Sequence, residues 1–164
     1  MFVETDPNVK VRVVIDTNVL VTALYDIKPI AKYLLTGNLI LIWNQYIFDE
    51  AKEIIKRLDG TLFANAQITR GVAEEILGCI TQNGIKVGEM PDCHPRITKD
   101  RDDDPFLWAA VQGNAQFIIS RDQHILYLGQ YQNIPIGGPA EFFIWVGKKH
   151  PMINKHLCNI GLLF

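Results

Sequence analysis

The segment VRVVIDTN, residues 11–18, carries the strongest structural signal in the chain. Its first five residues form a short β-branched run that ends at Asp16. Such runs are typical of strands buried on both faces of a parallel sheet. A helical stretch at 30–35 follows, closed by Thr-Gly-Asn at 36–38, and a second apolar run occupies 39–43. Together these segments predict a β-α-β unit.

The same alternation continues along the chain. Between 44 and 58, apolar residues recur at the spacing of one helical face, which predicts an amphipathic helix. We expect the remaining elements in this order: a helix or helix pair at 63–82, a strand at 85–87, an acid-capped helix within 102–113, a strand at 116–120, a short helix at 125–128, a strand at 134–136 and a last helix from Pro139. This alternation predicts an α/β fold with a mostly parallel sheet covered on both faces.

The composition is that of an ordinary globular protein. The chain has 164 residues, 48% hydrophobic and 21% charged, so we expect one domain over 1–164, with 151–164 as a C-terminal tail. A formal net charge of −2 excludes a polybasic protein that holds nucleic acid by bulk electrostatics. Three cysteines without a C-x-x-C pair favour the reducing cytoplasm, and the apolar stretches are too short to predict a membrane span.

Acidic residues follow two of the predicted strands. Asp16 ends the first strand, and Asp122 comes just after the strand at 116–120. In open parallel sheets, ligands gather at the carboxyl ends of strands near a topological switch point. A single Asp there is more often a helix N-cap, but the run Asp16-Thr17-Asn18 adds a hydroxyl and an amide. These oxygen ligands suit Mg²⁺ or Mn²⁺ better than zinc.

Glu50 stands out among the acids of the 44–58 helix. On a helical wheel it lies beside the apolar stripe, whereas Asp49 and Glu53 point away from it. A solvated helix carboxylate would normally pair with Lys or Arg one turn further on, yet the residue at that position is Ile54. We therefore predict a functional role for Glu50.

The run Asp102-Asp103-Asp104 precedes a predicted helix, and its simplest interpretation is a negative N-terminus that complements the helix dipole. The wheel places Asp103 on the inward face and Asp104 on the outward face. Pro105 favours the first helical position, which would make Asp104 the N-cap. We therefore predict Asp103 as the site residue and Asp104 as the cap, so that Asp104→Ala costs about 1 kcal/mol and spares activity.

Four stretches carry a resemblance to a known family: VVIDTNVLVTAL, YIFDEAKEII, DRDDDPFLWAAVQGNAQFIISRDQHIL and IPIGGPAEFF. In this order they resemble the PIN-domain proteins, in particular the VapC-like toxin components of bacterial toxin–antitoxin systems. The resemblance implies a three-layer α/β/α fold with a central parallel sheet, and a ribonuclease that depends on Mg²⁺ or Mn²⁺. It also implies an RNA substrate, an antitoxin partner and self-association, most simply as a homodimer.

The resemblance also implies site residues. The family's acidic positions, which bind metal and are catalytic, match Asp16, Glu50, Asp103 and Asp122. Auxiliary positions fall on Asn18, Ser120 and Asp104. Two positions depart from the family pattern: Ser120 replaces a Thr, and His124 stands where a second acid is common. Lys99, Arg101 and Arg121 flank the motifs, either as phosphate contacts or as solvated surface charge.

A non-catalytic function is the alternative. Acids at parallel strand ends also suit a phospho-accepting receiver domain, which places a Lys after its last strand. Here Gly137-Gly138 follows the predicted strand at 134–136 instead. An interaction module whose crevice only binds a partner is a third interpretation. Metal-dependent nuclease activity would separate both from the enzyme.

Overall fold

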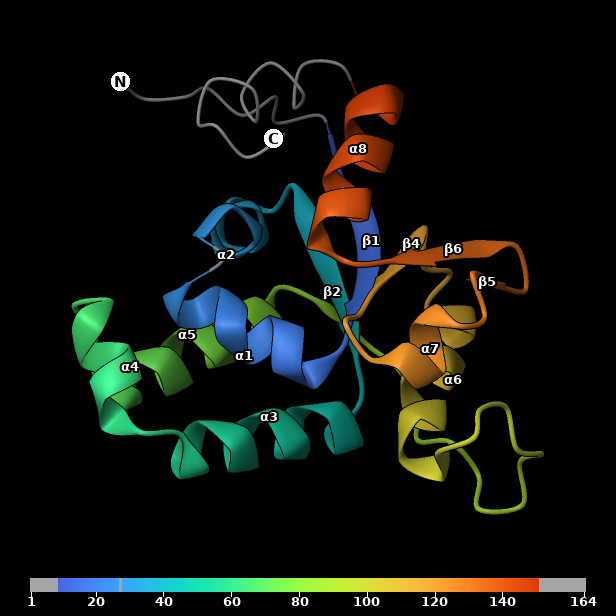
Figure 1. The fold of residues 1–164 in the computed structure, drawn as a ribbon, viewed down its shortest axis with the longest axis horizontal. Helices are drawn as coiled ribbons and strands as arrows, with labels where there is room; N and C mark the ends of the chain where they lie inside the picture. Colours follow the sequence, from blue (N-terminus) through green and yellow to red (C-terminus); the bar gives the residue numbers. More distant parts are fainter. Residues whose placement is uncertain (1–8, 27, 151–164) are drawn as a thin grey trace.

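The computed structural model describes residues 9–26 and 28–150, drawn as a ribbon in Figure 1. Six strands form a sheet in the order β3-β2-β1-β4-β6-β5. Their bounds are β1 (Val11–Ile15), β2 (Leu39–Trp43), β3 (Ile85–Lys86), β4 (Phe117–Ile119), β5 (Gln130–Tyr131) and β6 (Ile134–Gly137). Neighbouring strands pair in parallel, except β5 and β6, which are antiparallel. The predicted mostly parallel sheet is therefore confirmed.

Helices flank the sheet, as the three-layer α/β/α prediction requires. Their bounds are α1 (Thr17–Tyr25), α2 (Lys28–Thr36), α3 (Gln45–Arg57), α4 (Gly60–Asn65), α5 (Arg70–Gln82), the 3₁₀ helix η1 (Arg101–Asp103), α6 (Asp104–Gln112), α7 (Gln123–Leu126) and α8 (Pro139–Lys149). Among the described residues, no helix has the length and apolarity needed to span a bilayer. The C-terminal tail expected at 151–164 lies outside the described residues.

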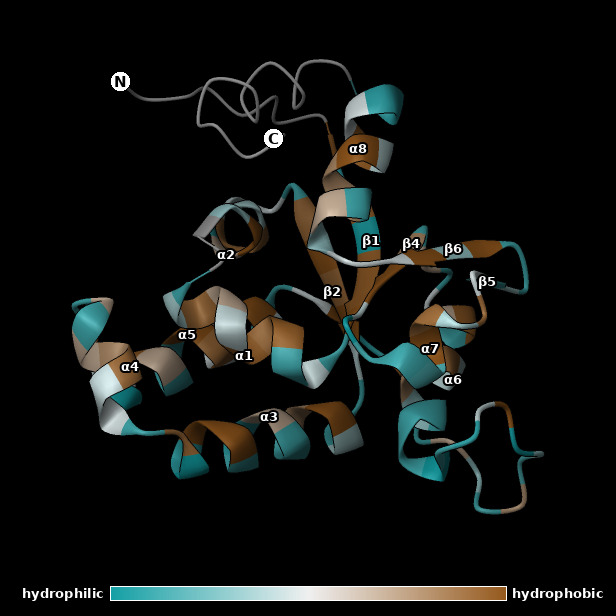
Figure 2. Ribbon diagram, in the orientation of Figure 1, coloured by the Kyte–Doolittle hydropathy of each residue, from teal (hydrophilic) through white to brown (hydrophobic). Residues whose placement is uncertain are grey.

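The central strand β1 is buried on both faces, as its sequence predicts. Val11, Val13 and Ile15 pack in one hydrophobic core with residues of α1, α2, α5 and α8. Val14 packs in a second core with residues of α6 and α7. Figure 2 shows the hydrophobic strands between these two groups of helices. Helices on both faces of the sheet confirm the three-layer architecture.

Several element boundaries differ from the predicted ones. The stretch predicted as a helix or helix pair is a pair, α4 and α5, and it begins at Gly60. The short helix predicted at 125–128 begins at Gln123, and β5 was not predicted. The predicted helix stop at 36–38 is confirmed, because Gly37 has a φ of 83°, a conformation that favours glycine.

The strand order creates a switch point beside β1. β2 pairs with one edge of β1 and β4 with the other, so the chain extends the sheet in opposite directions from this strand. The carboxyl ends of β1 and β4 therefore lie side by side at a crevice of the kind that binds ligands in open parallel sheets.

Candidate functional site

Asp16 and Ser120 meet at this switch point. Asp16 directly follows β1, and Ser120 directly follows β4. The Ser120 hydroxyl donates to Asp16 Oδ2 at 2.9 Å, and the Asp16 backbone N–H donates to the Ile119 carbonyl at 2.8 Å. Both side chains are buried. The pairing of two strands thus fixes the direction of the Asp16 carboxylate.

Asp122 stands at the start of α7, as its N-cap. Its Oδ1 accepts from the His124 backbone N–H at 2.8 Å, and its own backbone N–H donates to Ser120 Oγ at 2.9 Å. Ser120 therefore connects the loop after β4 to Asp16. Burial raises the pKa of Asp16, and the negative charge of Asp122 raises it further, which reflects how close the two carboxylates are.

Glu50 reaches the same site from α3. The Thr17 hydroxyl, in the first turn of α1, donates to Glu50 Oε2 at 2.6 Å. The charge of Glu50 also contributes to the raised pKa of Asp16. Among the described residues, Glu50 forms no ion pair with Lys or Arg, as the helical wheel predicts. Its partner is instead a hydroxyl beside Asp16.

Asp103 points into the fold, as predicted, although its neighbour Asp104 is buried as well. Asp103 ends η1, is 8% exposed, and its Oδ2 has no hydrogen-bond partner. Burial raises its pKa to about 6, with smaller contributions from the charges of Asp122, Asp100 and Asp16. The contact on this oxygen is with His124, whose Nδ1 lies 3.5 Å away. A buried oxygen among like charges is where a cation would be stabilised.

The predicted role of Asp104 as an exposed helix cap is wrong. Asp104 is fully buried in the first turn of α6, and Asp103 takes the N-cap position without a side-chain cap bond. Asp104 Oδ1 accepts from the backbone N–H and hydroxyl of Thr98 at 2.8 and 2.7 Å, and Oδ2 accepts from the Ile97 N–H at 3.0 Å. Although burial raises the pKa of Asp104, these hydrogen bonds outweigh it, so the pKa lies below its usual value. Asp104 holds the preceding loop against α6.

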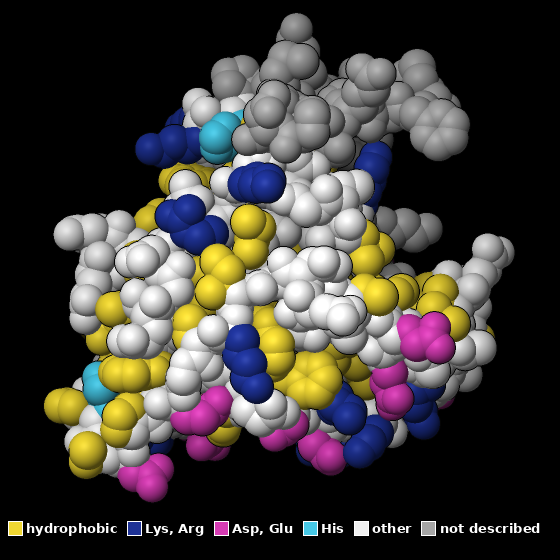
Figure 3. Space-filling view, turned by 180° about the vertical axis from the view of Figure 1, so that it is seen from behind, with side chains coloured by type: hydrophobic (Ala, Val, Ile, Leu, Met, Phe, Trp, Pro, Cys, Tyr) yellow, Lys and Arg dark blue, Asp and Glu magenta, His cyan; other side chains and the backbone are white. Residues whose placement is uncertain are grey.

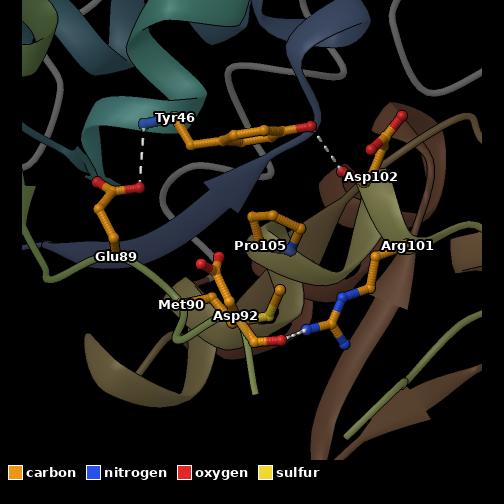
Figure 4. A pocket seen from close by; sticks show the side chains of 7 residues that line it. All are labelled: Tyr46, Glu89, Met90, Asp92, Arg101, Asp102 and Pro105. Carbon is orange, nitrogen blue, oxygen red and sulfur yellow. Dashed lines mark hydrogen bonds between the residues drawn. The ribbon is translucent and has the colours of Figure 1, made fainter. Parts of the chain in front are cut away.

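A cavity of about 320 Å³ lies beside this loop (Figure 4). It is lined by Tyr46, Glu89, Met90, Asp92, Arg101, Asp102 and Pro105. Tyr46 makes two of its hydrogen bonds: its backbone N–H donates to Glu89 at 3.3 Å, and its hydroxyl donates to the Asp102 carbonyl at 3.2 Å. Arg101 donates to the Asp92 carbonyl at 3.2 Å. Burial, followed by nearby carboxylates, raises the pKa of Tyr46 to about 12, so its hydroxyl stays a donor. These bonds fix the loop that enters η1.

Two residues that sequence reasoning did not select join the cluster. Asp100, Asp103 and His124 each offer one ligand atom, and these atoms lie within 4.8 Å of one another. Asp100 lies outside the run Asp102-Asp103-Asp104, and its closeness to Asp103 depends on the turn that η1 makes. Asn18, predicted as auxiliary, is exposed in α1, and no hydrogen bond joins its side chain to the acids among the described residues.

The residues present fit a divalent cation. The donor set is rich in carboxylate oxygens, which suit Mg²⁺ and Mn²⁺, and His124 adds a nitrogen that Mn²⁺ accepts more readily than Mg²⁺. Asp103 Oδ2 supplies a buried oxygen without a hydrogen-bond partner, and its contact is with His124, with no Lys or Arg paired to this oxygen among the described residues.

A family model described as a PIN domain matches residues 12–124, well over half of the chain. The chain belongs to the PIN-domain family. PIN domains are generally nucleases that act on RNA and typically use divalent metal ions, so this PIN domain has a nuclease fold with an acidic cluster at its switch point. A comparison with curated proteins gives no match.

The raised pKa of Asp103 predicts how the metal-free protein responds to pH. Its carboxyl titrates near 6 when folded and near 4 when unfolded, so the folded state binds more protons between these values. The free energy of unfolding therefore falls as pH rises from about 4 to 6, and above pH 6 this loss of stability stays constant. In EDTA, we expect Asp103→Asn to raise the melting temperature at pH 8 and to have little effect below pH 4.

The matched control is Asp102→Asn, which alters an exposed acid of the same run. It should leave the melting temperature unchanged at both pH values. A lower melting temperature of Asp103→Asn at pH 8 would contradict the proposed repulsion among the clustered acids.

Proposed function

We propose that this PIN domain is a divalent-metal-dependent endoribonuclease that hydrolyses RNA phosphodiester bonds. Its metal-binding and catalytic acids are Asp16, Glu50, Asp103 and Asp122. One observation carries the proposal: four acids from four separate segments interact around Asp16 and around the buried, unpartnered oxygen of Asp103. An acid cluster without a compensating Lys or Arg needs a cation to be stable in the ionised form.

The chain's own residues hold these acids in place. Ser120 orients Asp16, and Thr17 orients Glu50, each through a hydroxyl donor. Asp16, Glu50, Asp103 and Asp122 would hold Mg²⁺ or Mn²⁺, which would supply positive charge at the scissile phosphate and lower the pKa of an attacking water. This chemistry needs no side-chain nucleophile, and it explains how a chain of net charge −2 acts on a polyanion.

The wider role is part of the same proposal. The family resemblance supports a toxin of a toxin–antitoxin pair, with an antitoxin that covers the acidic site and a chain that forms homodimers. We also propose that 1–164 is a single nuclease domain. A receiver-like module is not favoured, because Gly138 and Pro139 follow β6 where a receiver would carry Lys.

The experiment compares the wild-type protein with Asp16→Asn on mixed single-stranded RNA in Mg²⁺, Mn²⁺ or EDTA. Asn keeps the shape of the side chain and an acceptor for Ser120, but it lacks the charge that holds a cation. We expect cleavage by the wild-type protein in either metal and at least about 100-fold less by the variant. Asp49→Asn, an exposed acid of α3, serves as the matched control and should cleave normally. Equal cleavage by wild-type and Asp16→Asn proteins would refute the proposal.

A further inference from the structure

A groove of about 710 Å³ opens beside the acidic cluster. Its walls come from two segments that are far apart in sequence, the loop at 96–99 and the segment at 123–128 formed by α7 and the turn after it. Ile97, Leu126 and Leu128 contribute apolar groups to its lining. Its volume and its mixed polar and apolar lining suit a flat, partly apolar group.

Tyr127 is the most exposed large hydrophobic residue among those the structure describes, at 83%. Its side chain is exposed although its backbone is fixed, because its N–H donates to the Gln123 and Ile125 carbonyls at the end of α7. No hydrogen bond engages its hydroxyl within the described part of the chain. A solvent-facing aromatic ring is a stacking surface, and the one contact made with this ring among the described residues is the Lys99 ammonium over it.

Positive charge lies next to this ring. Lys99 Nζ is 5.6 Å from the ring centroid of Tyr127, and Arg96 lines the same groove. Neither cation forms an ion pair with a carboxylate in the described residues, unlike Arg101, which contacts Asp104 Oδ2 at 3.4 Å. Lys and Arg side chains are otherwise scattered over the surface, as the face in Figure 3 shows. The groove therefore offers a local anion contact on a chain without a bulk basic patch.

His124 connects the groove to the acids. It lines the groove, and its Nδ1 lies 3.5 Å from Asp103 Oδ2 and 3.6 Å from Asp122 Oδ1. Thr98, on the opposite wall, donates its hydroxyl to Asp104 Oδ1 at 2.7 Å. A group bound in the groove therefore lies beside His124, the residue that contacts two of the clustered carboxylates.

We propose that the groove binds an unpaired base of the RNA strand, next to the phosphate that the acidic cluster cleaves. The base stacks on Tyr127, while Arg96 and Lys99 contact the flanking phosphates. Aromatic rings bind bases of any sequence, but only where the base face is free, so the site selects single-stranded over paired RNA. This inference rests on the proposed function for its substrate class alone.

The test measures binding of a fluorescein-labelled single-stranded RNA of mixed sequence by fluorescence anisotropy. It uses Mg²⁺ and an Asp103→Asn parent protein, so that the RNA stays intact. We expect Tyr127→Ala and Tyr127→Leu to weaken binding on the order of tenfold and Tyr127→Trp to preserve it, because stacking needs a ring. The double variant Arg96→Ala/Lys99→Ala should lower the slope of log affinity against log salt by about 1.4, the value for two lost phosphate contacts.

Controls come from α8, away from the groove. Ile144→Ala removes another exposed hydrophobic residue and Lys148→Ala/Lys149→Ala removes two exposed cations, and both should bind RNA like the parent. Unchanged affinity of Tyr127→Ala for RNA would overturn the inference and would favour a protein partner as the ligand of the groove. Cleavage by the wild-type protein is measured separately. RNA binding that depends on Tyr127, found without cleavage, would support the base-binding groove and contradict only the proposed nuclease activity.

Discussion

Asp103→Asn is expected to reduce RNA cleavage by more than about 100-fold while the protein stays folded. Loss of a residue that only orients a metal ligand typically costs 10–100-fold, so loss of a ligand should cost at least as much. Asn fits the buried position and removes one negative charge from a cluster in which burial and neighbouring carboxylates already raise the pKa of Asp103 to about 6. The same substitution should therefore lower activity and raise the stability of the metal-free protein.

This opposite response separates a functional acid from a structural one. Initial rates on labelled RNA in Mg²⁺, measured beside thermal melts in EDTA, give both quantities from one preparation. Asp102→Asn is the neighbouring control and should change neither rate nor melting temperature, since Asp102 is exposed. Full activity of Asp103→Asn would remove this residue from the proposed site.

Asp104→Ala is expected to destabilise the fold by about 3–5 kcal/mol, the range for breaking a buried charged partnership. The substitution leaves the backbone N–H groups of Ile97 and Thr98 without an acceptor inside the protein, and it removes the ion pair with Arg101. Each unsatisfied buried donor costs about 1–3 kcal/mol. Equilibrium unfolding in urea measures the change, and the activity lost in this variant should follow the folded fraction.

Two further variants make the result specific. Thr98→Val removes one hydroxyl donor to Asp104 and should cost less than Asp104→Ala. Asp102→Ala, at an exposed position of the same run, should change the free energy of unfolding very little. A cost near 1 kcal/mol for Asp104→Ala would instead favour the helix-cap role predicted from the sequence.

Helices and strands could be predicted from the sequence where burial gives the apolar residues a regular pattern. The run at 11–15 is β-branched because β1 packs on both faces, and the 44–58 helix shows its apolar stripe. β5 was missed because it has two residues and joins β6 through Gln132 and Asn133, both at positive φ, without the Asn-Gly signature of such turns. Short antiparallel additions of this kind have no periodicity to detect.

Individual residues of the site could be predicted from the sequence, but most of the contacts between them could not. Glu50 could be selected because its helix offers no cation at the following turn. Its hydrogen-bond partner is instead the Thr17 hydroxyl. Asp104 could not be placed, because a helical wheel describes the helix and says nothing of the loop at 97–98 that folds back onto it. The contact of Ser120 with Asp16 depends on β1 and β4 being neighbours, which is a property of strand order.

The most direct test of the proposed nuclease is the rate of RNA cleavage by one wild-type preparation before EDTA, after EDTA, and after Mg²⁺ or Mn²⁺ is restored in excess. The clustered acids predict cleavage in the first state, loss of cleavage in the second, and recovery in the third, because the carboxylates would need a bound cation to act on RNA. Cleavage that continues undiminished in EDTA, or absence of cleavage in all three states, would contradict the account.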